Sequence, residues 1–286
     1  MYRKYLFFLF VIFGFLLHFT ACDIINPRED IPAYVRIDSV VLIQQSSSYH
    51  TTQNISDVWI NLDGKQMGVY QLPAQFPLIA DGQHHITIRA GIKNNGISAS
   101  RIIYPFYSFY ELDTEFVPQQ IIKLVPDFKY KDDLTKWIET FEDPGYKLEL
   151  TTKSDTTLYR VPDPRDSLER VGAFYLSADR PVFQCVTTES FPLSYNAAGI
   201  FVELDYMNEQ DFVLGLFINK ANQTIETPII YINPHSDSFN KIYIDLLYIV
   251  SQNPDALDYN IFIGAERVDS LSNPKIYFDN LTLIYP

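Results

Sequence analysis

The stretch GIFVELDYMNEQDFVLGLFIN, from Gly199 to Asn219, contains two runs in which apolar residues occupy every second position. The residues of these two predicted faces are Ile200, Val202, Leu204 and Tyr206 in the first run and Phe212, Leu214, Leu216 and Ile218 in the second. Alternate side chains of a strand point to opposite faces, so each run predicts a strand with one buried face. Strands of this kind favour a two-sheet β-sandwich.

The same pattern returns on the C-terminal side of this stretch. NKIYIDLLYIV predicts a strand with Ile242, Ile244, Leu246, Tyr248 and Val250 on one face, and the chain ends in the strand-like KIYFDNLTLIYP. No ten-residue window shows a convincing helical period of 3.6 residues. The sequence therefore predicts an all-β domain over residues 138–286.

Three segments of this half, WIETFEDP, GIFVELDY and IYFDNLTLIY, resemble the jelly-roll sandwiches of carbohydrate-binding modules and their galactose-binding-like relatives. The resemblance implies that the opening and closing strands lie side by side. It also implies a structural calcium ion there, with Glu139 and Asp279 as candidate ligands together with backbone carbonyls. The alternative is that these acids face solvent or cap a turn. No other cofactor is expected.

Residues 33–125 read as a second, smaller β-sandwich. In AYVRIDSVVLI the alternation places Val35, Ile37, Val41 and Ile43 on one predicted face. The pairs Asp63-Gly64 and Asp81-Gly82 are typical of tight turns next to strands. The segments VWINLDGKQMGVY and LIADGQHHITI resemble a PEGA-like domain, which implies a structural or adhesive setting. The charged segment PDFKYKDDLTKW predicts a linker at residues 126–137.

The N-terminus combines a basic start, an apolar run too short to span a membrane, and a small residue before Cys22. This pattern resembles a bacterial lipobox, which implies a signal peptide at 1–21 and a diacylglycerol on Cys22. The alternatives are an ordinary secretory signal with a chance cysteine, or an uncleaved anchor. The acidic RED within the tether at 22–32 resembles a surface-export signal of Bacteroidota lipoproteins. We expect an outer-membrane location and favour the cell surface, with the periplasmic face as the open alternative.

Composition limits the classes of partner. The chain has 286 residues and a net charge of −13, which repels phosphate backbones and argues against nucleic acid as a partner. Aromatic residues are abundant, with 21 Phe, 20 Tyr and 2 Trp, and they supply ample material for a core and for contact surfaces.

The sequence contains no pattern that indicates catalysis. It has no Gly-x-Ser-x-Gly elbow and no phosphate-binding glycine loop. His84 and His85 are adjacent on a predicted strand, so they point to opposite faces and cannot chelate one ion together. We therefore expect no catalytic residues and no enzyme.

Sugar binding needs exposed aromatic faces near loops, and four residues fit this description: Tyr175, Phe191, Tyr195 and Tyr231. Tyr195 and Tyr231 are the ligand-binding candidates. The denser YPFYSFY, from Tyr104 to Tyr110, predicts one face packed in the first domain and another against a partner.

These observations lead to two functional hypotheses. The first is a lipid-anchored accessory subunit that docks on an integral outer-membrane protein complex and serves assembly, transport or adhesion, because tethering lets a weak interface suffice. The alternative is a surface lipoprotein that binds glycans through its C-terminal jelly roll.

Overall fold

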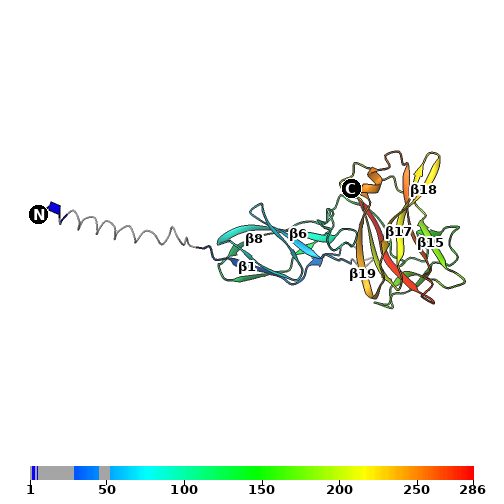
Figure 1. Ribbon diagram of the computed structural model, residues 1–286, viewed down its shortest axis with the longest axis horizontal. Helices are drawn as coiled ribbons and strands as arrows, with labels where there is room; N and C mark the ends of the chain where they lie inside the picture. Colours follow the sequence, from blue (N-terminus) through cyan, green and yellow to red (C-terminus); the bar gives the residue numbers. More distant parts are fainter. Residues whose placement is uncertain (1, 4, 6–28, 45–51) are drawn as a thin grey trace.

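The computed structural model describes residues 2, 3, 5, 29–44 and 52–286 of the chain. Two β-sandwiches follow one another in sequence and lie end to end (Figure 1). The predicted all-β fold class is confirmed. Cys22, nearly all of the predicted signal peptide and most of the predicted tether lie outside the described residues. No helix among the described residues has the length and hydropathy needed to cross a membrane.

Ten strands of the N-terminal sandwich lie in the described part of the chain. Its larger sheet has the order β4-β3-β6-β7, with β8 also paired to β6, and its other strands form the sheets β5-β1-β9 and β10-β2. The strands are β1 (Ala33–Ile37), β2 (Val41–Leu42), β3 (Asp57–Leu62), β4 (Lys65–Gln71), β5 (Ala74–Leu78), β6 (Gly82–Lys93), β7 (Arg101–Ile103), β8 (Tyr110–Phe116), β9 (Ile121–Leu124) and β10 (Asp127–Phe128). The predicted turn between β3 and β4 is confirmed, with φ values of 50° at Asp63 and 79° at Gly64, as a two-residue hairpin needs.

The predicted alternation in AYVRIDSVVLI is wrong in its second half. Val35 and Ile37 are buried as expected, but Val41 is exposed, and Val40 and Leu42 are buried in its place. The cause is the break between β1 and β2. The residues between these strands shift the alternation by one position, so even-numbered instead of odd-numbered side chains of the second strand point to the core. Ile43 is exposed for the same reason.

The C-terminal sandwich packs two sheets around one core. One sheet has the order β13-β14-β21-β16-β19, with β11 also paired to β21, and the other has the order β12-β15-β20-β17-β18. The stacked rings of Phe174 in β14 and Phe183 in β15, with centroids 3.8 Å apart, join the two sheets. The strands are β11 (Thr135–Glu139), β12 (Leu148–Leu150), β13 (Tyr159–Pro162), β14 (Arg170–Tyr175), β15 (Val182–Thr187), β16 (Phe201–Asn208), β17 (Phe212–Lys220), β18 (Gln223–Ile232), β19 (His235–Asp245), β20 (Asp258–Glu266) and β21 (Lys275–Tyr285).

The first and last strands of this sandwich are neighbours, as the jelly-roll resemblance implied. β11 runs antiparallel to β21, with Trp137 opposite Leu283. The linker predicted at 126–137 is shorter than expected. Within it, β10 pairs with β2, and Phe128 is buried in the core of the N-terminal sandwich. The residues between β10 and β11 are therefore the actual connection.

The strand predicted over NKIYIDLLYIV ends early. β19 stops at Asp245, and the short helix α3 (Leu247–Ser251) replaces the rest of the predicted strand. The Asp245 carboxylate accepts a hydrogen bond from the backbone N–H of Leu247 at 2.9 Å, which favours a turn over a continued strand. Tyr248, predicted to be buried, is exposed.

The aromatic stretch YPFYSFY forms the interface between the two sandwiches. Tyr104, Phe106 and Tyr107 are buried, and the same core cluster contains Phe201 and Tyr243 of the C-terminal sandwich. The partner surface predicted for this stretch is therefore largely the second domain of the same chain.

Candidate functional site

The outer face of the sheet β12-β15-β20-β17-β18 carries a groove with a volume of ≈ 270 Å³. The strand register places Gln184, Gly264, Val213 and Tyr231 in one row across this face. These residues point outward because their neighbours in sequence, such as Phe212, fill the core. Gly264 has no side chain, so the middle of the row is low, and Tyr231 lies at its end with 64% of its surface exposed.

A glycine and a phenylalanine shape the floor of the groove. A Cβ atom on Gly215 would lie 2.4 Å from the ring of Phe262 and 2.6 Å from the carbonyl oxygen of Thr227. The Phe262 ring therefore fills the space that a larger residue at position 215 would need. Phe262 itself is buried, so it supports the floor and exposes little surface to a ligand.

Four polar side chains form a hydrogen-bonded chain along the groove. The hydroxyl of Thr151 donates to Gln184 Oε1 at 2.7 Å, and Gln184 Nε2 donates to Glu226 Oε1 at 2.9 Å. The ammonium group of Lys153 lies 2.5 Å from Glu226 Oε2. Each group holds its neighbour in place, so these donors and acceptors are positioned before any ligand arrives.

The polar character of this face continues along β17 and β20. Asn219 Nδ2 donates to Asp258 Oδ1 at 2.6 Å and to Asn260 Oδ1 at 2.8 Å. Asn260 lies opposite Phe217, which belongs to the same outward-facing set as Val213 and Asn219. The outer face therefore combines amides, carboxylates and an exposed aromatic ring.

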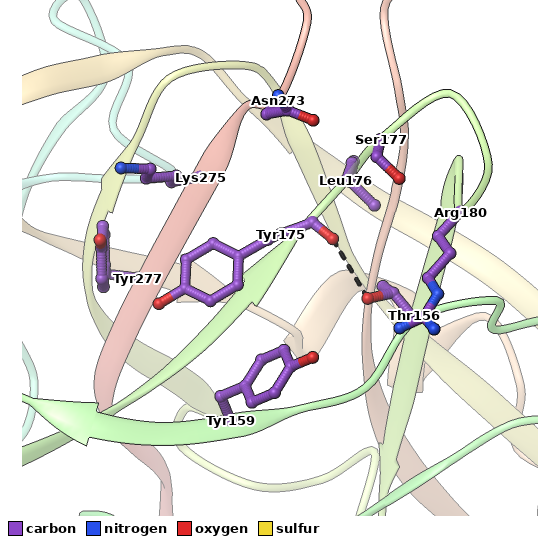
Figure 2. A pocket seen from close by; sticks show the side chains of 9 residues that line it. All are labelled: Thr156, Tyr159, Tyr175, Leu176, Ser177, Arg180, Asn273, Lys275 and Tyr277. Atoms are coloured by element: carbon purple, nitrogen blue, oxygen red, sulfur yellow. Dashed lines mark hydrogen bonds between the residues drawn. The ribbon is translucent and has the colours of Figure 1, made fainter.

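A second pocket, with a volume of ≈ 470 Å³, lies on the outer face of the opposite sheet (Figure 2). We call it the tyrosine pocket, because Tyr159, Tyr175 and Tyr277 line it from β13, β14 and β21. The ring centroids of Tyr159 and Tyr175 are 5.4 Å apart, with the ring planes 34° apart. Burial and the neighbouring Tyr277 raise the pKa of Tyr175 above its ordinary value.

The structure does not bring the two predicted calcium ligands into a shared site. The Glu139 carboxylate accepts hydrogen bonds from the backbone N–H groups of Phe141 at 2.7 Å and Lys147 at 2.6 Å. The Asp279 carboxylate instead pairs with Arg165 at 2.7 Å. Glu139 therefore caps a turn, which was the alternative expectation. The described residues contain no group of three or more acidic, histidine or cysteine side chains suited to a metal ion.

The four aromatic candidates have separate environments. Tyr231 lines the groove, and Tyr175 lines the tyrosine pocket. Tyr195 is 51% exposed but belongs to neither, and Phe191 is buried against Trp137 with ring centroids 5.5 Å apart. Tyr231 lines the groove and Tyr195 does not, so the groove does not bring these two predicted ligand-binding residues together.

Sequence reasoning missed the polar chain of the groove and two of the three pocket tyrosines. Gln184 and Glu226 each occupy an outward position in a strand, which alternation could have indicated. Their mutual contact depends on strand order, since 42 positions separate them in sequence. No pattern in one sequence shows that order.

The chain matches no protein-family model and no curated protein. It is similar in structure to the CBM22-1–GH10 modules of endo-1,4-β-D-xylanase 10B from Clostridium thermocellum, complexed with xylohexaose, at 13% identity and a TM-score of 0.39. That match covers 54% of this chain and 28% of the xylanase chain.

Two further solved structures are similar. The CBM22-2 xylan-binding domain of Xyn10C from Paenibacillus barcinonensis has 11% identity and a TM-score of 0.39, with 52% of this chain and 98% of that domain covered. A structure described as a basis for the promiscuous specificity of carbohydrate-binding modules from the β-sandwich superfamily has 10% identity and a TM-score of 0.40. That match covers 89% of this chain and 98% of the other chain. At these scores the similarity carries no information about a ligand.

Proposed function

We propose that the chain is a non-catalytic glycan-binding protein of the bacterial envelope, and that its C-terminal sandwich holds a saccharide in the groove beside Tyr231. The observation that carries this proposal is the prearranged chain of Thr151, Gln184, Glu226 and Lys153 next to an exposed tyrosine ring. Saccharide hydroxyl groups donate and accept hydrogen bonds, and their apolar ring faces pack on aromatic rings.

Glu226 is the central polar group in this proposal. Each of its carboxylate oxygens accepts one bond within the protein, from Gln184 and from Lys153. A carboxylate has about four acceptor positions, so capacity remains for sugar hydroxyls. Because the carboxylate is already oriented, a ligand has less side-chain entropy to remove on binding.

The expected lipid on Cys22 supplies the location in this proposal. Acyl chains bind membranes with about 0.8 kcal/mol per buried CH₂ group, which suffices for a stable anchor when several chains are present. We propose an outer-membrane protein facing the cell surface. Mass spectrometry of the mature protein should find acylated Cys22, and Cys22→Ala should release the protein from membranes. An unmodified N-terminus or a membrane-bound Cys22→Ala variant would contradict the anchor.

The accessory-subunit hypothesis loses most of the aromatic surface that favoured it. The stretch from Tyr104 to Tyr107 is buried against the second sandwich and so does not offer a free aromatic patch. We therefore place glycan binding first. Recovery of a stoichiometric integral membrane partner from detergent-solubilised envelopes would restore the subunit hypothesis.

A glycan array with the purified protein, followed by calorimetry on the best neutral ligand, tests the groove. We expect saturable binding that Tyr231→Ala and Glu226→Gln each weaken about tenfold or more, because each removes a stacking surface or a charged acceptor. Tyr248→Ala is the matched control, because Tyr248 is 70% exposed, lies in α3 and does not line the groove. Absence of binding to any neutral glycan, or equal binding by all variants, would refute the proposal.

A further inference from the structure

The tyrosine pocket differs in chemistry from the groove. Its floor is aromatic, and its ionisable groups other than tyrosine are two cations, Arg180 and Lys275. In Figure 2 these cations lie on opposite sides of Tyr175. Among the residues that the structure describes, neither the guanidinium of Arg180 nor the ammonium of Lys275 has an ion pair or a side-chain hydrogen bond. Two unpaired cations in one hollow stand out in a chain with a net charge of −13.

The strand register brings together the tyrosines that line the hollow. Tyr159 and Tyr277 both lie opposite Ala173, one from each side. Ala173 itself is fully buried, and Tyr175, two residues further along β14, lines the hollow together with these two tyrosines. The volume of ≈ 470 Å³ falls within the range of about 300–1,000 Å³ found for ligand pockets.

Glu209 is an acid that contacts the backbone of Lys275. The Glu209 carboxylate accepts a hydrogen bond from the backbone N–H of Lys275 at 2.9 Å, so it is directed to the main chain of that residue. The side chain of Lys275 remains free to meet a ligand anion. Asn273 and Ser177 at the rim add neutral groups that can bond hydroxyls.

We propose that the tyrosine pocket is a second saccharide site, selective for sugar units that carry a carboxylate. The tyrosine rings pack against the sugar rings, and Arg180 and Lys275, on opposite sides of Tyr175, each bind the carboxylate of a different unit of one oligosaccharide. This site lies on the opposite face of the sandwich from the groove and does not depend on it. One molecule can then hold a neutral glycan on one face and an acidic glycan on the other.

Calorimetry with oligogalacturonate and with its methyl ester tests the charge requirement, since the ester keeps the rings and removes the anion. We expect the acid to bind and the ester to bind at least tenfold more weakly, with affinity for the acid falling as salt rises. Arg180→Ala and Lys275→Gln should each weaken binding about tenfold. Lys65→Gln, an exposed lysine in the N-terminal sandwich, is the control for net charge.

Tyr159→Ala should also weaken oligogalacturonate binding, whereas Tyr231→Ala should leave it unchanged. Circular dichroism of each variant shows that the fold is retained. Equal affinity for acid and ester, no saturable binding, or a loss caused by Tyr231→Ala would overturn the second site. Binding of a sulfated oligosaccharide without binding of the carboxylated one would overturn the carboxylate assignment. None of these results bears on neutral glycans in the groove.

Discussion

Replacing Glu203 with leucine should weaken the joint between the two sandwiches more than any surface change. The Glu203 side chain is 1% exposed. Its carboxylate accepts hydrogen bonds from the hydroxyls of Tyr104 at 2.5 Å and Tyr130 at 2.7 Å, and it pairs with Lys241 at 2.7 Å. Burial lowers the pKa of Lys241, but Glu203 and Asp205 raise it by more, so the lysine stays charged inside the protein.

The size of the effect follows from what the substitution leaves behind. Without Glu203, the one acidic partner left to the buried ammonium of Lys241 among the described residues is the more distant Asp205, at 3.9 Å. Breaking a buried ion pair from one side costs about 3–5 kcal/mol. The hydroxyls of Tyr104 and Tyr130 also lose their acceptor, and each unsatisfied group costs about 1–3 kcal/mol, although these costs do not simply add. We expect a loss of about 4 kcal/mol or more in the free energy of unfolding, a large share of a typical 5–15 kcal/mol.

Urea unfolding of the purified protein, followed by circular dichroism and fluorescence, measures this loss. The double variant Glu203→Leu/Lys241→Met removes both charges and should recover at least about 2 kcal/mol relative to Glu203→Leu. Glu115→Leu, an exposed glutamate on β8, should change stability by no more than about 0.5 kcal/mol. A loss below about 1 kcal/mol for Glu203→Leu, or no recovery in the double variant, would refute the reasoning.

Two further predictions concern packing and pH. Gly172→Ala should lower the free energy of unfolding by about 1–3 kcal/mol, because its Cβ would lie 2.4 Å from the ring of Phe141. Gly145→Ala should leave it unchanged, because nothing lies within 4 Å of that Cβ. Equal urea unfolding midpoints for the two variants would contradict this. Burial and Asp205 raise the pKa of Asp279 to about 8 from its ordinary 3.8. At pH values between these two, Asp279 is protonated in the folded protein and ionised in the unfolded chain. The contribution of Asp279 to stability therefore falls as pH rises from about 4 to 8, and Asp279→Asn should reduce this slope in urea midpoints measured at pH 5 and 8; an unchanged slope would count against it.

Alternation along single strands was enough to predict the all-β fold class and much of the core. Val202, Leu204, Leu214 and Leu216 are buried as their period of two required, because a strand's facing is a local property of the backbone. The same rule failed where the backbone left the strand. Val41 followed a break in the chain, and Tyr248 fell in a helical turn.

The candidate sites were predictable only in part. Exposed loop-adjacent aromatics pointed to Tyr231 and Tyr175, which line the groove and the tyrosine pocket. Their polar and charged companions come from distant segments, for example Lys153 and Glu226 on either side of Gln184. Aromatic richness also misled: Tyr104 and Phe106 looked like a surface for a partner, yet the chain buries them against its own second domain.

The sequence by itself therefore determined the β-sandwich class and the composition of each strand face, since both follow from side-chain periodicity and turn chemistry. Only the tertiary structure decided which faces meet. Strand order brought Glu203 to Tyr104 and Tyr130, and it placed Ala173 between Tyr159 and Tyr277. The physical reason is that strand pairing over long separations is set by the packing of the whole core, which no short segment encodes.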